Sequence, residues 1–353
     1  MSKALIVIDG SRGEGGGQIL RTSLALSAIT GEPFRVTNIR ARRRKPGLMR
    51  QHLTAVEAAA RVACAEVQGA ELRSSELEFR PGIVQHGDYS FSIGTAGSAT
   101  LVLQTVLWPL VVTPGRSRLV LEGGTHNPMA PPFEFLDRAF LPLLRRLELV
   151  VEAKLEQAGF YPAGGGRVVV EIEGGRIPTS LCLDERGELV AREALAMVAN
   201  LPRSIAVREL GVVKRELGWS REECRVLELQ GRGPGNALCL MVQTEALTEV
   251  VTGIGEKGVL AEDVAAAAVA ELRRWLDSGA PVDEHLGDQL LIPMALTAAH
   301  AREGDEAPRY VGPTPSLHTT TNAEIIGRFL PVEFEFEALD ERRTRVWARR
   351  RGE

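Results

Sequence analysis

The sequence repeats one arrangement of helices and strands three times, and this repetition limits the folds open to the chain. Residues 16–30 have a helical pattern and precede a strand-like segment, and a second helix is predicted from Pro46. The same order returns at residues 97–113 and again from residue 285. The two helices of each pass lie roughly 30 residues apart, which is typical of one supersecondary unit used repeatedly. The alternative is a chance alternation of helices and strands in an ordinary α/β chain.

Residues 185–280 do not follow this repeat of helices and strands. They contain two strand-like segments, 204–210 and 237–245, and an alanine-rich helix over 261–279 that ends at a glycine. We therefore predict an inserted smaller α/β domain between two parts of a catalytic domain formed by residues 1–184 and 281–340. The arginine-rich segment 341–353 is expected to be a solvated tail, with RNA contact as the alternative.

Composition excludes several classes of protein. The values of 44% hydrophobic and 25% charged residues are ordinary for a globular protein, and the net charge of −4 argues against a globally basic nucleic-acid binder. The apolar stretch Leu101–Val112 is too short to cross a bilayer, and the first ten residues lack a signal-peptide cleavage pattern. The four cysteines have no metal-ligand spacing. We expect a cytoplasmic protein with no membrane partner.

A glycine-rich segment, Asp9–Gln18, lies between a predicted strand and a predicted helix. Its glycines allow the backbone to approach a ligand, and the helix start offers free N–H groups to an anion. The segment is neither a Walker A loop nor a Rossmann fingerprint. Glu14 is an acid within this anion-binding context, which favours a divalent cation that bridges it to a polyphosphate. The alternative is a tight turn with a solvated glutamate.

Six cations lie within the eleven residues from Arg40 to Arg50, directly before Gln51 and His52. Clustered arginines suit bidentate contacts to phosphate, and this cluster lies at a predicted junction between strand and helix. The cluster therefore favours phosphate binding over a merely solvated face, which remains the alternative.

His318 lies in a polar segment, residues 315–322, before a helix that Thr321 or Asn322 is expected to cap. An imidazole is partly neutral at pH 7, so it can attack a phosphorus atom without a strong base. A capping or surface histidine is the alternative interpretation.

Polar side chains recur at matching places near the helix starts of the three passes. Gln104 and the pair Asp288 and Gln289 correspond in this way to Gln18. Because polar groups are costly to bury unless paired, their equivalent positions suggest that they face one shared cleft. Exposed amides on helix surfaces are the alternative.

Seven stretches together resemble the RNA 3′-terminal phosphate cyclase family. They are residues 9–21, 39–56, 93–105, 123–132, 159–166, 284–296 and 318–322. The resemblance covers nearly the whole chain and is weakest over residues 185–280. It implies three copies of a unit with a four-stranded sheet and two helices, plus an inserted smaller α/β domain. It also implies ATP-dependent conversion of an RNA 3′-phosphate to a 2′,3′-cyclic phosphate, through a histidine–AMP intermediate, with release of AMP and diphosphate.

The resemblance also implies roles for individual residues. His318 matches the histidine that becomes adenylylated, and Glu14 matches the acid that meets Mg²⁺ or Mn²⁺ on the phosphates. The positions that match the nucleotide pocket are Gln104, His285, Leu286, Gly287, Asp288 and Gln289, with Pro131 a weaker candidate for packing on adenine. The positions that match the surroundings of the ATP or RNA phosphates are Arg21, Arg40, Arg43, Gln51 and His52.

Three rival functions are considered. A non-catalytic relative that acts in ribosome assembly lacks the nucleophile, which this chain retains at His318. An enolpyruvyl transferase would not be adenylylated, and a lysine-dependent ligase would have to use Lys257, which lies in the insertion. The sequence leaves open the physiological RNA, the preferred metal, activity on 5′-phosphate ends and the oligomeric state, with a homodimer as one option.

Overall fold

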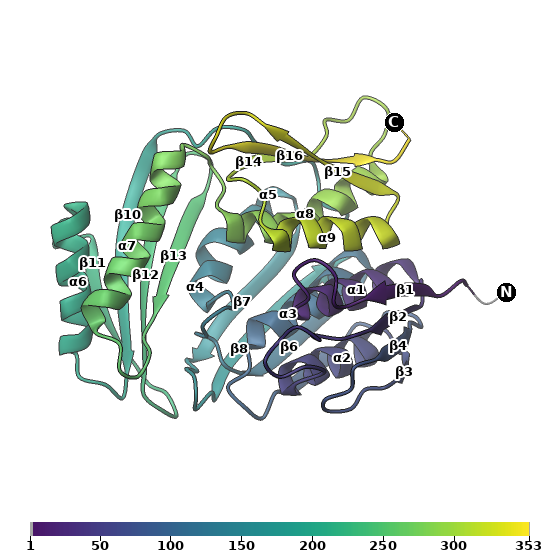
Figure 1. Ribbon diagram of the computed structural model, residues 1–353, viewed down its shortest axis with the longest axis horizontal. Helices are drawn as coiled ribbons and strands as arrows, with labels where there is room; N and C mark the ends of the chain where they lie inside the picture. The colour runs from purple at the N-terminus through teal and green to yellow at the C-terminus, as the bar shows by residue number, and fades with distance from the viewer. Residues whose placement is uncertain (1–2, 353) are drawn as a thin grey trace.

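The computed structural model describes residues 3–352, which form four sheets of four strands each with helices packed on them (Figure 1). Three of the sheets belong to units with one topology. Each unit runs strand, helix, strand, helix, strand, strand, and its sheet has the order first, second, fourth, third. The first two strands are parallel, and the other neighbours are antiparallel. The predicted threefold repeat of a four-stranded sheet with two helices is confirmed.

The elements of the three units occupy the following ranges. The first unit contains β1 (Ile6–Asp9), α1 (Gly17–Thr30), β2 (Phe34–Thr37), α2 (Arg50–Val62), β3 (Glu66–Gln68) and β4 (Leu77–Arg80). The second contains β5 (Asp88–Ser92), α3 (Ala99–Val112), β6 (Gly115–Gly123), the continuous helical segment α4 (Phe133–Phe135), η1 (Leu136–Phe140) and α5 (Leu141–Arg146), then β7 (Val150–Gln157) and β8 (Gly166–Gly174). The third contains β9 (Cys182–Leu183), α8 (Glu284–His300), β14 (Arg309–Gly312), α9 (Leu317–Phe329), β15 (Val332–Ala338) and β16 (Thr344–Arg350).

The fourth sheet lies in the chain between β9 and α8, within the third unit. Its elements are β10 (Leu189–Ala199), α6 (Ser204–Leu217), β11 (Cys224–Leu229), β12 (Gly235–Thr244), β13 (Thr248–Ile254) and α7 (Ala261–Ser278), with the strand order β11-β10-β12-β13. The two ends of this insertion meet, because Arg186 Nε donates to the carbonyl oxygen of Ala280 at 3.0 Å. The Arg186 guanidinium also lies 3.8 Å from the centre of the Trp275 ring.

Local sequence determines where the central helices begin and end. The side-chain oxygens of Ser98, Asp283 and Ser316 each accept a hydrogen bond from a backbone N–H three residues later, at the starts of α3, α8 and α9. Helix α1 ends at Gly31, whose φ of 70° is readily adopted by glycine. These side-chain caps therefore fix where α3, α8 and α9 begin.

Helices of the three units pack against one another in the middle of the molecule. Helix α1 contacts α3 and α9, while α2 also packs on α3 and α8 packs on α9. Twelve of the fourteen residues of α3 are buried, as expected for a helix that is apolar on all sides. The units share one continuous core, whereas residues of β10, α6, β12 and α7 in the insertion contribute to a second cluster.

Three expectations about secondary structure are wrong. Residues 204–210, expected as a strand, form the start of α6, because Ala206, Leu210 and Val213 recur at helical spacing on its buried face. Helix α2 begins at Arg50 and not at Pro46, since Gly47 has a φ of 76°.

The third concerns the arginine-rich segment, which is not a free tail over Thr344–Arg350. This strand, β16, lies between β14 and β15. Val346 and Ala348 are fully buried, and they alternate along the strand with the less buried Arg345, Trp347 and Arg349. Across residues 3–352, none of the helices is both long and apolar enough to cross a membrane.

Candidate functional site

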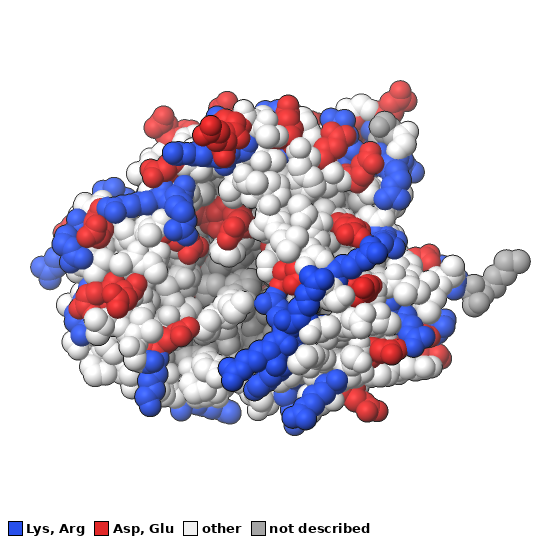
Figure 2. Space-filling model, in the orientation of Figure 1, with Lys and Arg blue, Asp and Glu red and all other residues white. Residues whose placement is uncertain are grey.

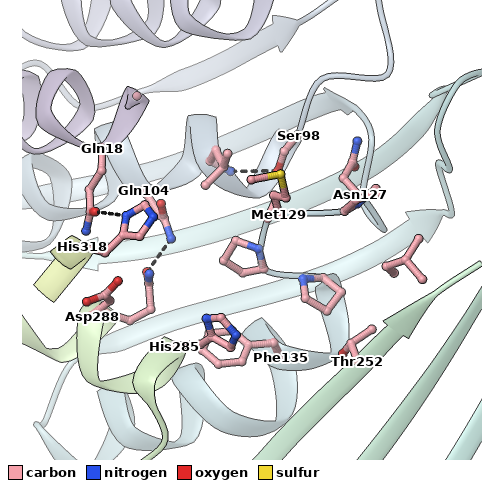
Figure 3. A pocket seen from close by; sticks show the side chains of 18 of the residues that line it. Gln18, Ser98, Gln104, Asn127, Met129, Phe135, Thr252, His285, Asp288 and His318 are labelled. Carbon is pink, nitrogen blue, oxygen red and sulfur yellow. Dashed lines mark hydrogen bonds between the residues drawn. The ribbon is translucent and has the colours of Figure 1, made fainter. Parts of the chain in front are cut away.

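A cavity of about 1280 Å³ lies where the loops and helix starts of the three units meet one face of the insertion (Figures 2 and 3). Most of the residues predicted for the site line it. They are Glu14, Arg21, Arg40, Arg43, Gln51, His52, Gln104, Pro131, His285, Asp288, Gln289 and His318. Residues almost 300 positions apart in the sequence thus share one chamber, as the matching positions of the repeats suggest.

The glycine-rich loop packs closely against α9. Gly13 has a φ of 54°, and a Cβ atom at this position would collide with the side chain of Thr321. The neighbouring backbone N–H of Glu14 donates to Thr321 Oγ1 at 3.1 Å. Glycine is therefore required here to join the first unit to the helix that carries His318.

The start of α1 faces the cavity without a side-chain cap. A Cβ atom at Gly17 would lie 2.6 Å from His52 Nε2 and 3.0 Å from an Arg21 nitrogen, so glycine lets these two side chains approach the helix end. Uncapped N–H groups beside a guanidinium are suited to binding an anion such as phosphate.

The carboxylate of Glu14 is buried, with a side-chain exposure of 8%. It forms an ion pair with Arg43, and His318 Nε2 lies 3.6 Å from Glu14 Oε1. Oε1 faces Arg43 and His318, whereas Oε2 accepts no hydrogen bond from any group within residues 3–352. A buried anionic oxygen without a hydrogen-bond donor is a group that a cation or a ligand can satisfy.

His318 lies in the first turn of α9, with about half of its side chain exposed to the cavity. The expectation that Thr321 or Asn322 caps this helix is wrong, because Ser316 is the cap and the helix starts before the histidine. His318 Nδ1 lies 2.8 Å from Gln18 Oε1 (Figure 3). Because the amide oxygen can only accept, Nδ1 carries the proton and Nε2 keeps its lone pair.

The surroundings of His318 favour its neutral form. Partial burial lowers its pKa below the usual value, and the positive charges of Arg43 and Arg21 act in the same direction, while Asp288 opposes them. An imidazole with a free lone pair at neutral pH is a competent nucleophile.

Arg21 and His52 form a buried polar pair beneath the start of α1. Burial lowers the pKa of Arg21 to about 10, so this guanidinium keeps its charge at neutral pH. Burial and the nearby charges of Arg40 and Arg21 lower the pKa of His52 to about 3, so it is neutral. Its Nδ1 accepts a hydrogen bond from the backbone N–H of Met49 at 3.3 Å. His52 therefore supports the start of α2 and adds no charge to the cavity.

Arg40, which is expected to lie around the phosphates, also has a structural role. Its Nη1 donates to the carbonyl oxygens of Lys45 (2.7 Å) and Gly47 (2.8 Å), so part of its donor capacity holds its own loop. Gln51 Oε1 accepts from the backbone N–H of Ser98 at 3.1 Å, which joins α2 to the start of α3. Both residues line the cavity while also fixing the loops around it.

The polar residues of α3 and α8 meet across the cavity wall. Gln104 Nε2 donates to Gln289 Oε1, and Asp288 Oδ1 accepts from Thr319 Oγ1 at 2.6 Å. Burial raises the pKa of Asp288 above the usual range. The predicted shared cleft between the second and third units is therefore present.

Two predicted pocket residues do not reach the cavity. The Leu286 side chain is fully buried in the core, since it lies on the face of α8 that packs inward. Gly287 is buried against Tyr310, where a Cβ atom would lie 2.8 Å from the phenolic oxygen. Their side chains position α8, and their contact with a nucleotide stays a prediction.

His285 is exposed at the junction between α8 and the insertion. The Glu271 carboxylate, 3.6 Å from His285 Nε2, raises the pKa of His285 to about 9, with Asp283 and Glu284 adding to the effect. Ligand atoms of Glu271, Asp283 and His285 all lie within 4.8 Å of one another. His285 therefore enters the site as an imidazolium paired with acids.

The sequence analysis does not identify several residues that line two walls of the cavity. The loop that follows β6 contributes Asn127 and Met129, and the insertion contributes Thr252, Glu256 and Asp263. The repeat predicts only that Gln18 corresponds to Gln104 and Gln289, and it does not predict the contact of Gln18 with His318. The motif of the loop, GGTHNPMAPP at 123–132, offered a signal for the first wall, whereas no local pattern marks the insertion residues.

The donor set suits a hard divalent cation. Glu14 supplies a buried carboxylate whose Oε2 has no hydrogen-bond donor within residues 3–352, and Mg²⁺ typically uses one or two carboxylates together with phosphate oxygens. The uncapped start of α1 and the guanidinium of Arg21 are placed to hold those phosphates nearby.

Comparison with known proteins agrees with this geometry. A family model described as RNA 3'-terminal phosphate cyclase matches residues 12–336. The chain belongs to the RNA 3′-terminal phosphate cyclase family. A relative in Koribacter versatilis (strain Ellin345), named RNA 3'-terminal phosphate cyclase, is 49% identical over 332 residues, which cover 94% of this chain and 91% of the relative. A relative of the same name in Ectopseudomonas mendocina (strain ymp) is 46% identical over 347 residues, covering 98% of each chain. The chain is thus an enzyme of the RNA 3′-terminal phosphate cyclase family.

Proposed function

We propose that this enzyme uses ATP to convert an RNA 3′-terminal phosphate to a 2′,3′-cyclic phosphate through an adenylylated His318. The observation that carries the proposal is the pairing of His318 Nδ1 with Gln18, which leaves Nε2 as a lone-pair donor beside Glu14 and Arg43. The names of the relatives support the reaction class.

In the first step, His318 Nε2 attacks the α-phosphorus of ATP. A nitrogen–phosphorus bond forms, the bond between the α-phosphorus and its bridging oxygen breaks, and diphosphate leaves. Gln18 keeps the proton on Nδ1 throughout, and Arg21, Arg43 and the start of α1 offset the charge of the phosphates.

Glu14 would hold Mg²⁺ or Mn²⁺, which supplies charge neutralisation on the phosphate oxygens when bound. Arg43 forms an ion pair with Glu14 and so keeps this carboxylate in place. Gln104, Asp288, Gln289 and Pro131 form the wall expected to hold the adenosine moiety, with His285 at its edge.

In the second step, an oxygen of the RNA 3′-phosphate attacks the adenylyl phosphorus and the nitrogen–phosphorus bond breaks. His318 returns to its neutral form with the proton on Nδ1. The adjacent 2′-hydroxyl then attacks the 3′-phosphorus, its proton passes to solvent, and AMP leaves as the ring closes. Only a ribose carries the required 2′-hydroxyl, so the chemistry itself selects RNA over DNA.

Intact-mass measurement after incubation with ATP and Mg²⁺ tests the proposal. We expect one added adenylyl group on the parent enzyme, none on His318→Ala, and the parental adduct on His300→Ala, which changes an exposed histidine outside the cavity. An adduct that persists in His318→Ala would contradict the assignment. A short RNA with a 3′-phosphate should lose the mass of one water when it is cyclised.

The same experiment separates the rival functions. A non-catalytic RNA-binding factor for ribosome assembly and an enolpyruvyl transferase would both remain unlabelled by ATP. A lysine-dependent ligase would carry the adduct on Lys257, and Lys257 does not line the cavity.

A further inference from the structure

The loop between β2 and α2 carries positive charge that the protein does not neutralise. Arg42, Arg44 and Lys45 are exposed, and within residues 3–352 none of them has a carboxylate oxygen within 4.0 Å. Elsewhere several exposed arginines are paired with acids, as in the salt bridges of Arg35, Arg116 and Arg203. Three unpaired cations in one loop beside the cavity form a local positive surface, which favours an anionic partner there although the net charge of the protein is −4.

These side chains project from a loop of defined shape. Arg40 has a φ of 53°, and its guanidinium binds the carbonyl oxygens of Lys45 and Gly47 from inside the loop. Arg42 lies against the glycine-rich loop, with its Cδ atom 3.8 Å from the position of a Cβ atom on Gly15. The loop therefore presents its cations in a fixed arrangement, which lowers the entropic cost of binding.

The same loop borders the cavity. Arg44 and Lys45 line it together with His318, and the preceding residue Arg43 pairs with Glu14 inside it. Figure 2 shows a band of basic side chains beside the hollow of the surface. A continuous path of positive charge thus leads from the proposed nucleophile to the outside of the protein.

The insertion side of the cavity has the opposite charge. Its lining includes Glu256, Asp263 and Glu271 from the insertion and Glu284 from α8. A polyanion that leaves the cavity is repelled on that side and attracted over the loop of the first unit.

We propose that the RNA chain preceding the 3′-terminal nucleotide leaves the cavity over Arg42, Arg44 and Lys45, which contact its phosphates without reading its bases. This inference rests on the proposed function, since it assumes that the 3′-phosphate end enters the cavity. The contacts are electrostatic, so they bind single-stranded RNA of any sequence and weaken with salt.

The test compares the parent enzyme with the double variant Arg42→Ala, Arg44→Ala. Binding of a fluorescent 12-nucleotide RNA with a 3′-phosphate is measured by anisotropy over a range of NaCl concentrations. Each lost phosphate contact should reduce the slope of log Kd against log salt by about 0.7, so the double variant should lose about 1.4. Thermal unfolding of the variants checks that they remain folded.

Two further variants serve as controls. Lys214→Ala, Arg221→Ala removes two exposed cations from the insertion away from the cavity, and it should keep the parental slope. Lys257→Ala removes an exposed cation beside Glu256 on the acidic rim, and it should also keep the slope. An unchanged slope in the Arg42, Arg44 variant, or a loss of slope in Lys257→Ala, would overturn the proposed path.

Substrate length distinguishes this inference from the proposed function. The Arg42, Arg44 variant should lose cyclisation of the 12-nucleotide RNA more than cyclisation of a nucleoside 3′-phosphate, which has no preceding phosphates. If the parent enzyme cyclises neither substrate, the proposed function fails. If the variant loses activity equally on both while the parent cyclises them, the function stands and the exit path is wrong.

Discussion

Gln18 Oε1 lies 2.8 Å from His318 Nδ1 and thereby determines which imidazole nitrogen can act as a nucleophile. The two residues come from the first and third units, 300 positions apart in the sequence. Hydrogen bonds between Thr22 and Asn322 (2.7 Å) and between Glu14 and Thr321 (3.1 Å) join the same two helical regions. The reactive orientation of the histidine is therefore set by packing between units.

Gln18→Leu should slow adenylylation of His318 by roughly tenfold, because the loss of the hydrogen bond that orients the imidazole should raise the activation free energy by about 1.4 kcal/mol. Gln18→Glu keeps the acceptor, so it should restore labelling, and its added negative charge should raise the pKa of His318. Rapid-quench measurement of AMP incorporation against pH checks both effects. Labelling of Gln18→Leu at the parental rate over the whole pH range would rule out a positioning role.

The pH dependence of labelling by the parent enzyme should follow the neutral form of His318. Burial and neighbouring cations lower the pKa of this imidazole, so the rate should stay high down to pH 6.5 and fall only at lower pH, as the nitrogen becomes protonated. Single-turnover labelling in buffers of constant ionic strength gives the midpoint. A midpoint well above 6.5 would show that the histidine is in a different environment.

Glu14→Gln should leave a folded enzyme that needs about tenfold or more Mg²⁺ for labelling, since it loses a charged metal ligand while keeping the shape of the side chain. The measurement is a titration of labelling rate with Mg²⁺. Glu284→Gln is the matched control, because Glu284 is exposed and lines the cavity from α8, while the ion pair of Arg43 within residues 3–352 is with Glu14. An equal shift in both variants would indicate a general effect of charge.

His52 should make stability depend on pH. Its pKa is about 3 in the folded protein and about 6.5 in the unfolded chain, so only the unfolded chain takes up a proton between these values. The contribution of neutral His52 to the free energy of unfolding is therefore fully present above pH 6.5. It decreases as the pH falls toward 3, by up to about 1.4 kcal/mol per pH unit.

His52→Gln should therefore lose less stability than the parent between pH 6.5 and pH 5. Urea unfolding at several pH values measures this difference, and His300→Gln, which changes an exposed histidine, should behave like the parent. Parallel curves for the parent and His52→Gln would contradict the assigned environment.

The repeat could be predicted from the sequence because it depends on local signals, whereas cavity residues such as Arg21, Pro131 and His285 follow only from the resemblance to the family. Helical spacing and the glycine that ends α1 are encoded within a few residues of each other. The matching places of Gln104 and Gln289 also follow once the repeat is recognised, and the two side chains do form a hydrogen bond.

The errors arose where long-range contacts decide the structure. The segment 204–210 has both apolar and polar residues, and its helical form is settled by burial of Ala206 and Leu210 in the insertion. Likewise, β16 is rich in arginine, but pairing with β14 and β15 makes it a strand. The acidic wall of Glu256 and Asp263 depends on how the insertion packs on the second unit, which no short motif encodes.

The contact between Arg186 and Ala280 has a consequence for how such a chain can change over evolutionary time. Because the entry and exit of the insertion are held together, a short turn in its place would still allow β9 to pair with β14. The loss or exchange of the insertion therefore need not unfold the three repeated units. The face formed by β13 is constrained more tightly, since a substitution there alters the chamber that holds the reactants.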